Sequence, residues 1–472
     1  MPPTRIDPDD RLKDSHAATV VSSEPRSRPL ASPPRARLTR AIIRSLVAVL
    51  VGSLILRVAA ETMNHMLQLY FKEINDNHYP LSYTVMGFIT ASFFISELLG
   101  APILGALSDR YGRKIFILLG PLFGAIAVQI TSMTVLIWLL VITRLLEGLS
   151  TASSVPSTLG YISEATSGRP ALRARIVGLF EITLVGGMAA GSIVGGYLWK
   201  YFGTPVEGIP LVSPAFSING LIYLVSLAVF AWGLKDIARR AGAQASAKGA
   251  RAKLDHYLSI IKEPAVWKFI PAWLAVFAII GMWSNLVVRL LTDKSSYNNQ
   301  VLMGNYSPDK IGIGKAILFV IFALGIVGWS FILGRYRKTS VMLVSMGGLF
   351  VTLLSAYGLN HLESFSSPLH YPLIIALALA VLVLSGFTPA ALTYLADVTE
   401  SHTEDRGSIM GLYSVFLGVG QLIGTTTGGY FADWSGIDGL LLLSAIFGLI
   451  TCFILVALRA QESTAVTVEA KP

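Results

Sequence analysis

Apolar segments near twenty residues long recur from residue 45 almost to the end of the chain, separated by short polar stretches. An α-helix needs about 20 residues to cross a bilayer, so each segment predicts a transmembrane helix. The sequence therefore predicts an all-α polytopic membrane protein with twelve spans. The predicted spans are 45–71, 83–107, 115–132, 135–163, 176–199, 214–234, 269–290, 313–333, 341–359, 372–396, 408–432 and 439–458.

Composition excludes several other classes of protein. Only 14% of the residues are charged, against roughly 25% in soluble globular domains. A mean hydropathy of +0.63 over 472 residues indicates many apolar segments rather than one anchor on a soluble enzyme. The one cysteine, Cys452, lies in an apolar segment, which excludes an intrachain disulfide and a thiolate metal cluster. We expect neither a metal nor a cofactor, and no enzyme.

Polar stretches divide the chain into five parts. Residues 1–44 hold seven prolines and nine basic residues without an apolar stretch, which predicts a disordered basic tail and no signal peptide. A polar linker at 235–265 separates two six-helix bundles, at 45–234 and 266–459. A short polar tail, 460–472, ends the chain.

Basic residues are unevenly distributed between the two sides of the predicted membrane. If the N-terminus is cytoplasmic, 29 of the 37 Lys and Arg residues lie in the tails and loops on that side, and five, including Lys315, lie outside. The positive-inside rule therefore predicts a multi-pass protein of the cell membrane with both termini cytoplasmic. Topology explains the net charge of +9, so no nucleic-acid partner is expected.

An internal repeat supports the division into two bundles. A shift of 233 residues gives thirteen ungapped matches over the 48 positions from 156 to 203, among them Glu164 on Asp397 and a row of glycines on a second row. Duplicated halves with a binding site at their interface are a plan of many transporters.

The loop between the second and third spans carries the most specific motif. It reads Gly105-Ala-Leu-Ser-Asp109-Arg110-Tyr-Gly112-Arg113-Lys114 and resembles the signature of the major facilitator superfamily. The resemblance implies two pseudo-symmetric six-helix bundles, alternating access, solute transport and an inner gate formed by this motif. The corresponding loop, 334–338, is basic but has no equivalent aspartate, so we expect the gate to depend on the first half.

Charged residues inside the spans are expensive and predict function. Arg144 and Glu147 resemble the R-x-x-[QE]-G pattern of the same superfamily. Arg57, Glu61 and His65 lie at i, i+4 and i+8 on one helix face, and Glu61 is predicted at the depth of Arg144, which allows pairing across the two helices. We expect His65, near a helix end, to be a surface or interfacial residue.

The balance of charge suggests proton coupling. Two arginines, Arg57 and Arg144, face four glutamates, so at least one glutamate is expected to hold a proton. The candidates for proton coupling are Glu61, Glu147, Arg57, Arg144 and Glu97. A structural role as buried ion pairs that tie helices together remains the alternative.

The fifth span contains Gly187, Gly191, Gly195 and Gly196, similar to the glycine-rich antiporter motif of the superfamily, with Ser192 in place of its proline. With the Tyr161 to Glu164 stretch, this resembles the 12-span drug:proton antiporter branch. Close helix packing explains the glycines equally well.

Spans of the second half are expected to lack mid-membrane charges and to supply aromatic and amide side chains instead. A substrate pocket from this half is predicted, with lipid-facing or packing roles as the alternative. The pocket candidates are Trp273, Phe277, Asn285, Phe387, Tyr413 and Gln421.

Taken together, these features predict a monomeric secondary active transporter that exports a lipophilic or amphipathic small molecule in exchange for protons. An importer or uniporter of a sugar, metabolite or lysolipid is one alternative. A membrane receptor or scaffold that carries no flux is another.

Overall fold

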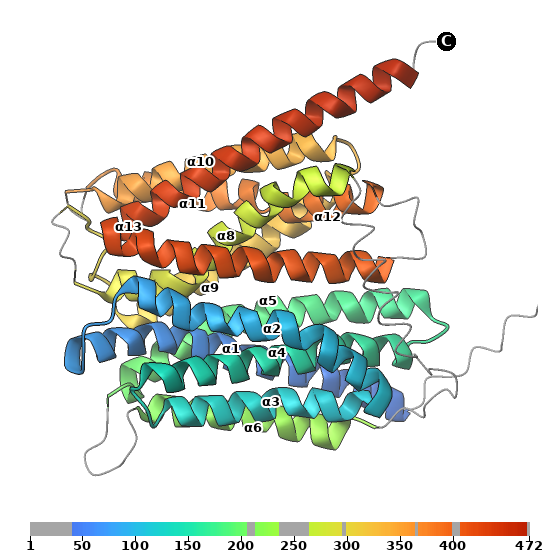
Figure 1. Ribbon diagram of the computed structural model, residues 1–472, viewed down its shortest axis with the longest axis vertical. Helices are drawn as coiled ribbons and strands as arrows, with labels where there is room; N and C mark the ends of the chain where they lie inside the picture. Colours follow the sequence, from blue (N-terminus) through green and yellow to red (C-terminus); the bar gives the residue numbers. More distant parts are fainter. Residues whose placement is uncertain are drawn as a thin grey trace, which may run out of the picture. The chain divides into compact units, whose positions relative to one another are not determined.

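The computed structural model describes residues 40–204, 213–235, 264–294, 299–363, 367–398 and 406–469, and the regular structure in these ranges is helical (Figure 1). Much of the predicted N-terminal tail, nearly all of the linker and the last residues of the C-terminal tail lie outside these ranges. The first group of helices is α1 (Arg40–Asn77), α2 (Tyr83–Tyr111), α3 (Arg113–Thr131), α4 (Ile137–Ala165), α5 (Pro170–Phe202) and α6 (Pro214–Gly233). The second is α8 (Pro264–Thr292), α9 (Pro308–Ser330), α10 (Lys338–Asn360), α11 (His370–Leu384), α12 (Phe387–Val398) and α13 (Arg406–Glu469).

The helices confirm a multi-pass membrane protein. Ten described stretches are long and apolar enough to cross a membrane. One of them, Val415–Ala460 within α13, covers most of the predicted span 408–432 and all of 439–458, and Ser435 and Gly436 leave the helical conformation and kink the helix between the two. Helix α4 is not among the ten, although it is 29 residues long. The twelve predicted spans fit this arrangement.

Helix boundaries follow from local sequence. Pro170, Pro214 and Pro308 stand at the first positions of α5, α6 and α9, where a missing N–H costs nothing. The Ser82 hydroxyl accepts the N–H of Val85 and caps α2. Proline therefore marks the start of helices in both halves.

The predicted span 372–396 is divided in the structure. Helix α11 ends at Leu384 and α12 begins at Phe387. Pro389 has no N–H to donate to the Ser385 carbonyl, so the hydrogen-bond ladder stops there. Gly386 lies where a Cβ atom would approach the Trp329 ring to 2.6 Å, so the chain passes close under that ring at the break.

The first span begins earlier than expected. Helix α1 starts at Arg40, inside the predicted tail. Arg44 donates to the Trp232 carbonyl at 2.8 Å and its guanidinium lies 3.8 Å from the centre of the Trp232 ring. These contacts hold the basic start of α1 against the end of α6.

Two sets of helix contacts organise the chain. In the first half α1 packs on α5 and α6, and α4 on α2 and α3; in the second half α13 packs on α8 and α10. The halves meet along α2 with α13 and α5 with α9 (Figure 1). We call the end of the bundles with the connections at 112, 166–169 and 331–337 the basic end. The end with the connections at 78–82 and 132–136 is the far end.

Candidate functional site

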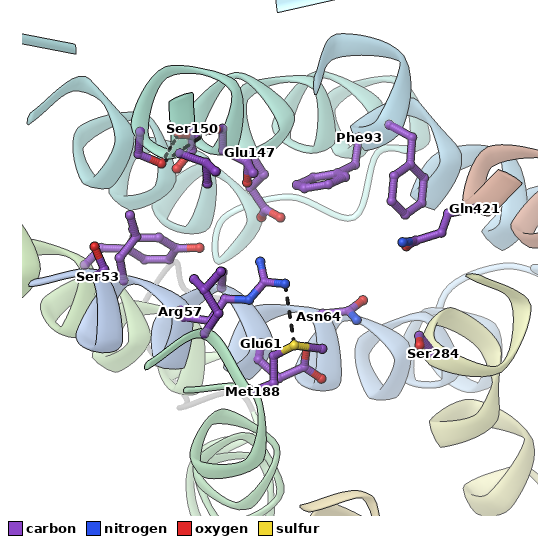
Figure 2. A pocket seen from close by; sticks show the side chains of 18 of the residues that line it. Ser53, Arg57, Glu61, Asn64, Phe93, Glu147, Ser150, Met188, Ser284 and Gln421 are labelled. Atoms are coloured by element: carbon purple, nitrogen blue, oxygen red, sulfur yellow. Dashed lines mark hydrogen bonds between the residues drawn. The ribbon is translucent and has the colours of Figure 1, made fainter. Parts of the chain in front are cut away.

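A cavity of about 170 Å³, partly open to solvent, is lined by residues of both halves, from α1, α2, α4, α5, α6, α8 and α13. Figure 2 shows Arg57 and Glu61 of α1 opposite Glu147 of α4, with Ser284 and Gln421 contributed by the second half. Residues that are distant in sequence thus share one internal surface.

Arg144 and Glu147 form a buried ion pair within α4. The pairing with Glu61 across helices that the similar depth would allow is not formed in this structure. Residues three apart lie on one helix face, so Glu147 reaches Arg144 before any residue of α1 does. The Arg144 guanidinium also lies 5.2 Å from the centre of the Phe93 ring.

Glu61 pairs with the other half of the molecule. Its carboxylate accepts Lys315 Nζ at 2.7 Å and the Ser192 hydroxyl at 3.3 Å, and Lys315 also donates to the Ser284 carbonyl. Both charged side chains are only 9% exposed. This ion pair joins α1 to α9.

Two expectations about Lys315 are therefore wrong: it is not a loop residue, and the spans of the second half do carry a buried charge. Helix α9 begins at Pro308, so Lys315 lies two turns inside it. The predicted span 313–333 already contained Lys315, but the count of basic residues assigned it to the outer side. The Pro308 start signal was the feature that could have found it.

His65 and Glu97 lie away from the cavity lining. His65 is fully buried, at 0% exposure, and its prediction as a surface or interfacial residue is wrong. A Cβ atom on Gly195 would be 2.9 Å from His65 Cβ, so the absence of that atom lets α5 cover the histidine. Glu97 lies on the seam between α2 and α4, beside Gly148.

The predicted substrate pocket is only partly assembled around this cavity. Asn285 and Gln421 line it. Trp273 and Phe277 are buried in an aromatic cluster instead, with ring centroids 6.2 Å apart. Phe387 lines a smaller apolar cavity. The side chain of Tyr413 lies outside the described residues.

A polar row on α4 was missed by the sequence reasoning. Ser150, Ser154 and Thr158 line the cavity at successive turns, together with Thr151. The Ser150 hydroxyl donates to the Gly120 carbonyl at 2.6 Å, which ties this face of α4 to α3. The Ser and Thr run from 150 to 158 inside an apolar span was the available signal.

At the basic end, Arg113 joins three helices. Its guanidinium lies 2.5 Å from Asp109 at the end of α2 and 2.5 Å from Glu164 at the end of α4. Gly112, with φ of 106°, makes the turn from α2 into α3. A Cβ atom on Gly160 would overlap the guanidinium, so that glycine makes room for Arg113.

The second half holds a corresponding pair. Lys338 at the start of α10 lies 3.1 Å from Asp397 near the end of α12, and Asp397 is the repeat counterpart of Glu164. The loop has no aspartate, but the neighbouring helix supplies the acid, which the expectation of an asymmetric gate overlooked. The other motif residues have smaller contacts: Gly105 faces Pro156, and Arg110 is exposed.

We expect Arg113→Gln to lower the thermal unfolding midpoint of the purified protein in detergent micelles. The pairs with Asp109 and Glu164 are partly exposed, so the loss should be about 0.5–1 kcal/mol. The matched control is Arg110→Gln on the exposed side of the same loop. An equal loss in both variants would contradict a specific role of Arg113.

The predicted glycine row packs helices closely in both halves. Added Cβ atoms on Gly187, Gly191 and Gly195 would come within 3.0 Å of α1. Their repeat counterparts Gly420, Gly424 and Gly428 face α8 in the same way. Gly196 and its counterpart Gly429 face the other half, at Pro308 and Tyr83.

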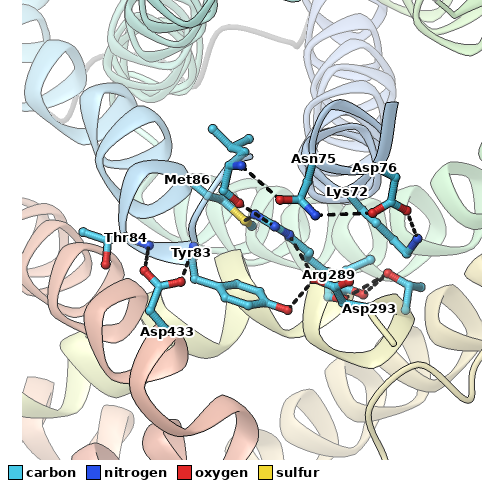
Figure 3. Close-up of polar contacts among 12 residues, drawn as sticks. Lys72, Asn75, Asp76, Tyr83, Thr84, Met86, Arg289, Asp293 and Asp433 are labelled. Carbon is cyan, nitrogen blue, oxygen red and sulfur yellow. Dashed lines mark hydrogen bonds and ion pairs between the residues drawn. The ribbon is translucent and has the colours of Figure 1, made fainter. Parts of the chain in front are cut away.

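Polar contacts between the halves gather at the far end (Figure 3). The Asp433 carboxylate of α13 accepts the backbone N–H groups of Tyr83 at 2.7 Å and Thr84 at 2.8 Å, and so caps α2 from the other half. Arg289 of α8 donates to the Leu81 carbonyl at 2.6 Å. These contacts tie the two halves together at the far end.

The internal repeat relates this cap to a second contact between the halves. Lys200 at the end of α5 lies 2.9 Å from Asp309 at the start of α9. Lys200 and Asp433 are repeat counterparts, each at the far end of its half. Both seams between the halves are thus tied by a charged residue from equivalent helices.

Known proteins resemble this chain in sequence and in fold. Residues 40–304 and 295–471 match the profile of the Major Facilitator Superfamily. Over 122 residues the chain is 32% identical to Multidrug resistance protein 1 of Bacillus subtilis, covering 26% of this chain and only 31% of that protein. Over 360 residues it is 23% identical to the class H tetracycline resistance protein of Pasteurella multocida, covering 75% of this chain and 82% of that protein.

Among solved structures, the nucleoside transporter NupG superposes with a TM-score of 0.67 at 14% identity, covering 88% of this chain and 98% of that one. At this identity the likeness is one of fold. The profile match, however, extends over nearly all of the described chain. The protein belongs to the Major Facilitator Superfamily of membrane transporters and resembles its drug:proton antiporter branch.

Proposed function

We propose that the protein exports a lipophilic or amphipathic small molecule in exchange for protons, by alternating access of the cavity between its halves. The observation that carries the proposal is the ion pair of Glu61 with Lys315, a buried acid that ties one half to the other beside the cavity. Relatives named for multidrug and tetracycline resistance support export.

Protonation of Glu61 would act on the closure between the halves. It removes the negative partner of Lys315 and weakens the tie between α1 and α9, which favours opening of the far end. Glu147 is proposed as a second proton carrier, and Arg57, Arg144 and Glu97 as residues that modulate the two acids.

Orientation follows from the charge distribution. The positive-inside rule puts the basic end in the cytoplasm, which makes both termini cytoplasmic. The protein is proposed to be a monomer in the cell membrane. Ser53, Thr158 and Phe180 continue the cavity toward the basic end, while contacts between the halves tie the far end together. The structure then corresponds to an inward-facing state.

Flux into liposomes tests the proposal. Purified protein is reconstituted, a pH gradient is imposed, and movement of ethidium, tetracycline and naphthalene-2-sulfonate is followed. These probes represent cationic, zwitterionic and anionic amphipathic compounds. We expect gradient-driven movement of at least one probe, reduced at least tenfold in Glu61→Gln.

Two results would contradict proton-coupled export. One is movement of every probe at the rate of protein-free liposomes. The other is gradient-driven movement that persists in Glu61→Gln. If downhill exchange alone survives in variants with each acid replaced by its amide, an importer or uniporter becomes the better description.

A further inference from the structure

Arg57 is the cation of the cavity for which the described residues supply no carboxylate partner. Of the three cations in and beside the cavity, Arg144 is held by Glu147 and Lys315 by Glu61. Within the described ranges the Arg57 guanidinium donates only to the Met188 sulfur, at 3.6 Å (Figure 2). A thioether is a weak acceptor, so most of the hydrogen-bonding capacity of this guanidinium is unused.

A buried atom of Arg57 also lacks a hydrogen-bond partner. Its Nε atom is buried and has no hydrogen-bond partner among the described residues. Glu97 and Glu181 are within electrostatic range of it, but among the described residues neither forms an ion pair with it. Leaving a buried donor unpaired is costly, which favours an acceptor that arrives from outside the protein.

Apolar walls surround this cation. Leu56, Phe93, Phe180 and Leu184 line the same cavity. On the same helix, the Asn64 side chain also faces the cavity, and its Oδ1 atom has no described partner. The lining thus combines apolar side chains with charged and neutral polar ones, which suits a compound that has both an apolar body and a polar group.

We propose that the cavity takes an amphipathic organic anion, whose negative group pairs with Arg57 while its apolar body packs on the surrounding walls. The inference rests on the proposed function for the use of this cavity as the transport site. A cation would face repulsion from Arg57, and Glu61 and Glu147 are each already paired with a cation, Lys315 and Arg144. An anion gains charge-assisted hydrogen bonds without breaking either ion pair.

Three ligands that share one ring system test the charge preference: naphthalene-2-sulfonate, naphthalene-2-sulfonamide and 2-naphthylmethylammonium. Their binding to the purified full-length protein in micelles is measured by calorimetry. We expect the sulfonate to bind at least about tenfold more tightly than the sulfonamide, as a charge-assisted hydrogen bond provides. The ammonium compound should bind most weakly.

Variants assign the preference to Arg57. In Arg57→Gln the sulfonate and the sulfonamide should bind within about twofold of each other, and Arg57→Lys should keep part of the preference because it keeps the charge. Arg175→Gln removes an exposed charge at the start of α5 and should leave the preference unchanged. Should Arg57→Gln not fold, the order of affinities in the unsubstituted protein and in Arg57→Lys decides.

Equal affinities for the sulfonate and the sulfonamide, or a preference that persists in Arg57→Gln, would overturn the inference. Calorimetry needs no gradient, so its result is independent of proton coupling. Ethidium flux that depends on Glu61 but not on Arg57 would leave export standing and this inference overturned. A preference for the sulfonate without gradient-driven flux would support this inference and contradict proton-coupled export.

Discussion

Lys315→Gln is expected to lower both the stability of the closed far end and the rate of gradient-driven transport. Lys315 Nζ lies 2.7 Å from the Glu61 carboxylate in a pair that is 9% exposed on each side. Removing one member strands the other charge, which costs about 3 kcal/mol even with some relief from water in the cavity. Thermal unfolding in micelles measures the loss of stability.

Opening of the far end is measured by labelling from that side. In a Cys452→Ser background, Ser284→Cys places a thiol in the cavity. Lys315→Gln should increase its reaction with a membrane-impermeant maleimide added to the far side. In the protein that keeps Lys315, we expect the closed far end to keep this thiol inaccessible to the maleimide.

A double variant distinguishes pairing from a general loss of charge. Glu61→Gln with Lys315→Gln leaves no stranded charge and should recover most of the lost stability, but not transport. Lys310→Gln, on the exposed side of the same helix, is the control and should change neither. A double variant no more stable than Lys315→Gln would show that the pair contributes nothing.

Gly424→Ala is expected to disrupt the seam between α8 and α13. The added Cβ atom would lie 1.9 Å from the Ala278 carbonyl oxygen, which is backbone and has little freedom to move. Overpacking of this kind costs about 1–3 kcal/mol or more. We expect a lower unfolding midpoint in micelles and a smaller yield of folded protein.

The same substitution elsewhere gives graded controls. Gly191→Ala meets the Val58 carbonyl oxygen at 2.6 Å and should be milder than Gly424→Ala. Gly186→Ala, on the same helix as Gly191, meets nothing within 4 Å and should be neutral or slightly stabilising. A wild-type midpoint for Gly424→Ala would mean that the seam relaxes at no cost.

Much of the fold was predictable because it depends on local chemistry. Apolar length marks the spans, since a bilayer demands about 20 residues per helix. The glycine rows stood out because both copies survive in the sequence, and the structure packs each row against its partner helix. The Asp109 to Arg113 motif lies in one short loop, so its residues were found together.

Partners of the buried charges depended on the tertiary structure. The sequence places Glu61 and Lys315 254 residues apart, and only the packing of α1 against the second half brings them together. Arg144 pairs with Glu147 of its own helix, and Trp273 packs in an aromatic cluster. Both outcomes depend on the tertiary structure, because neighbouring helices decide the rotation of a helix about its axis. Sequence alone therefore determined the spans, the repeat and the family motif. The tertiary structure decided which charges pair, and left Arg57 facing the cavity.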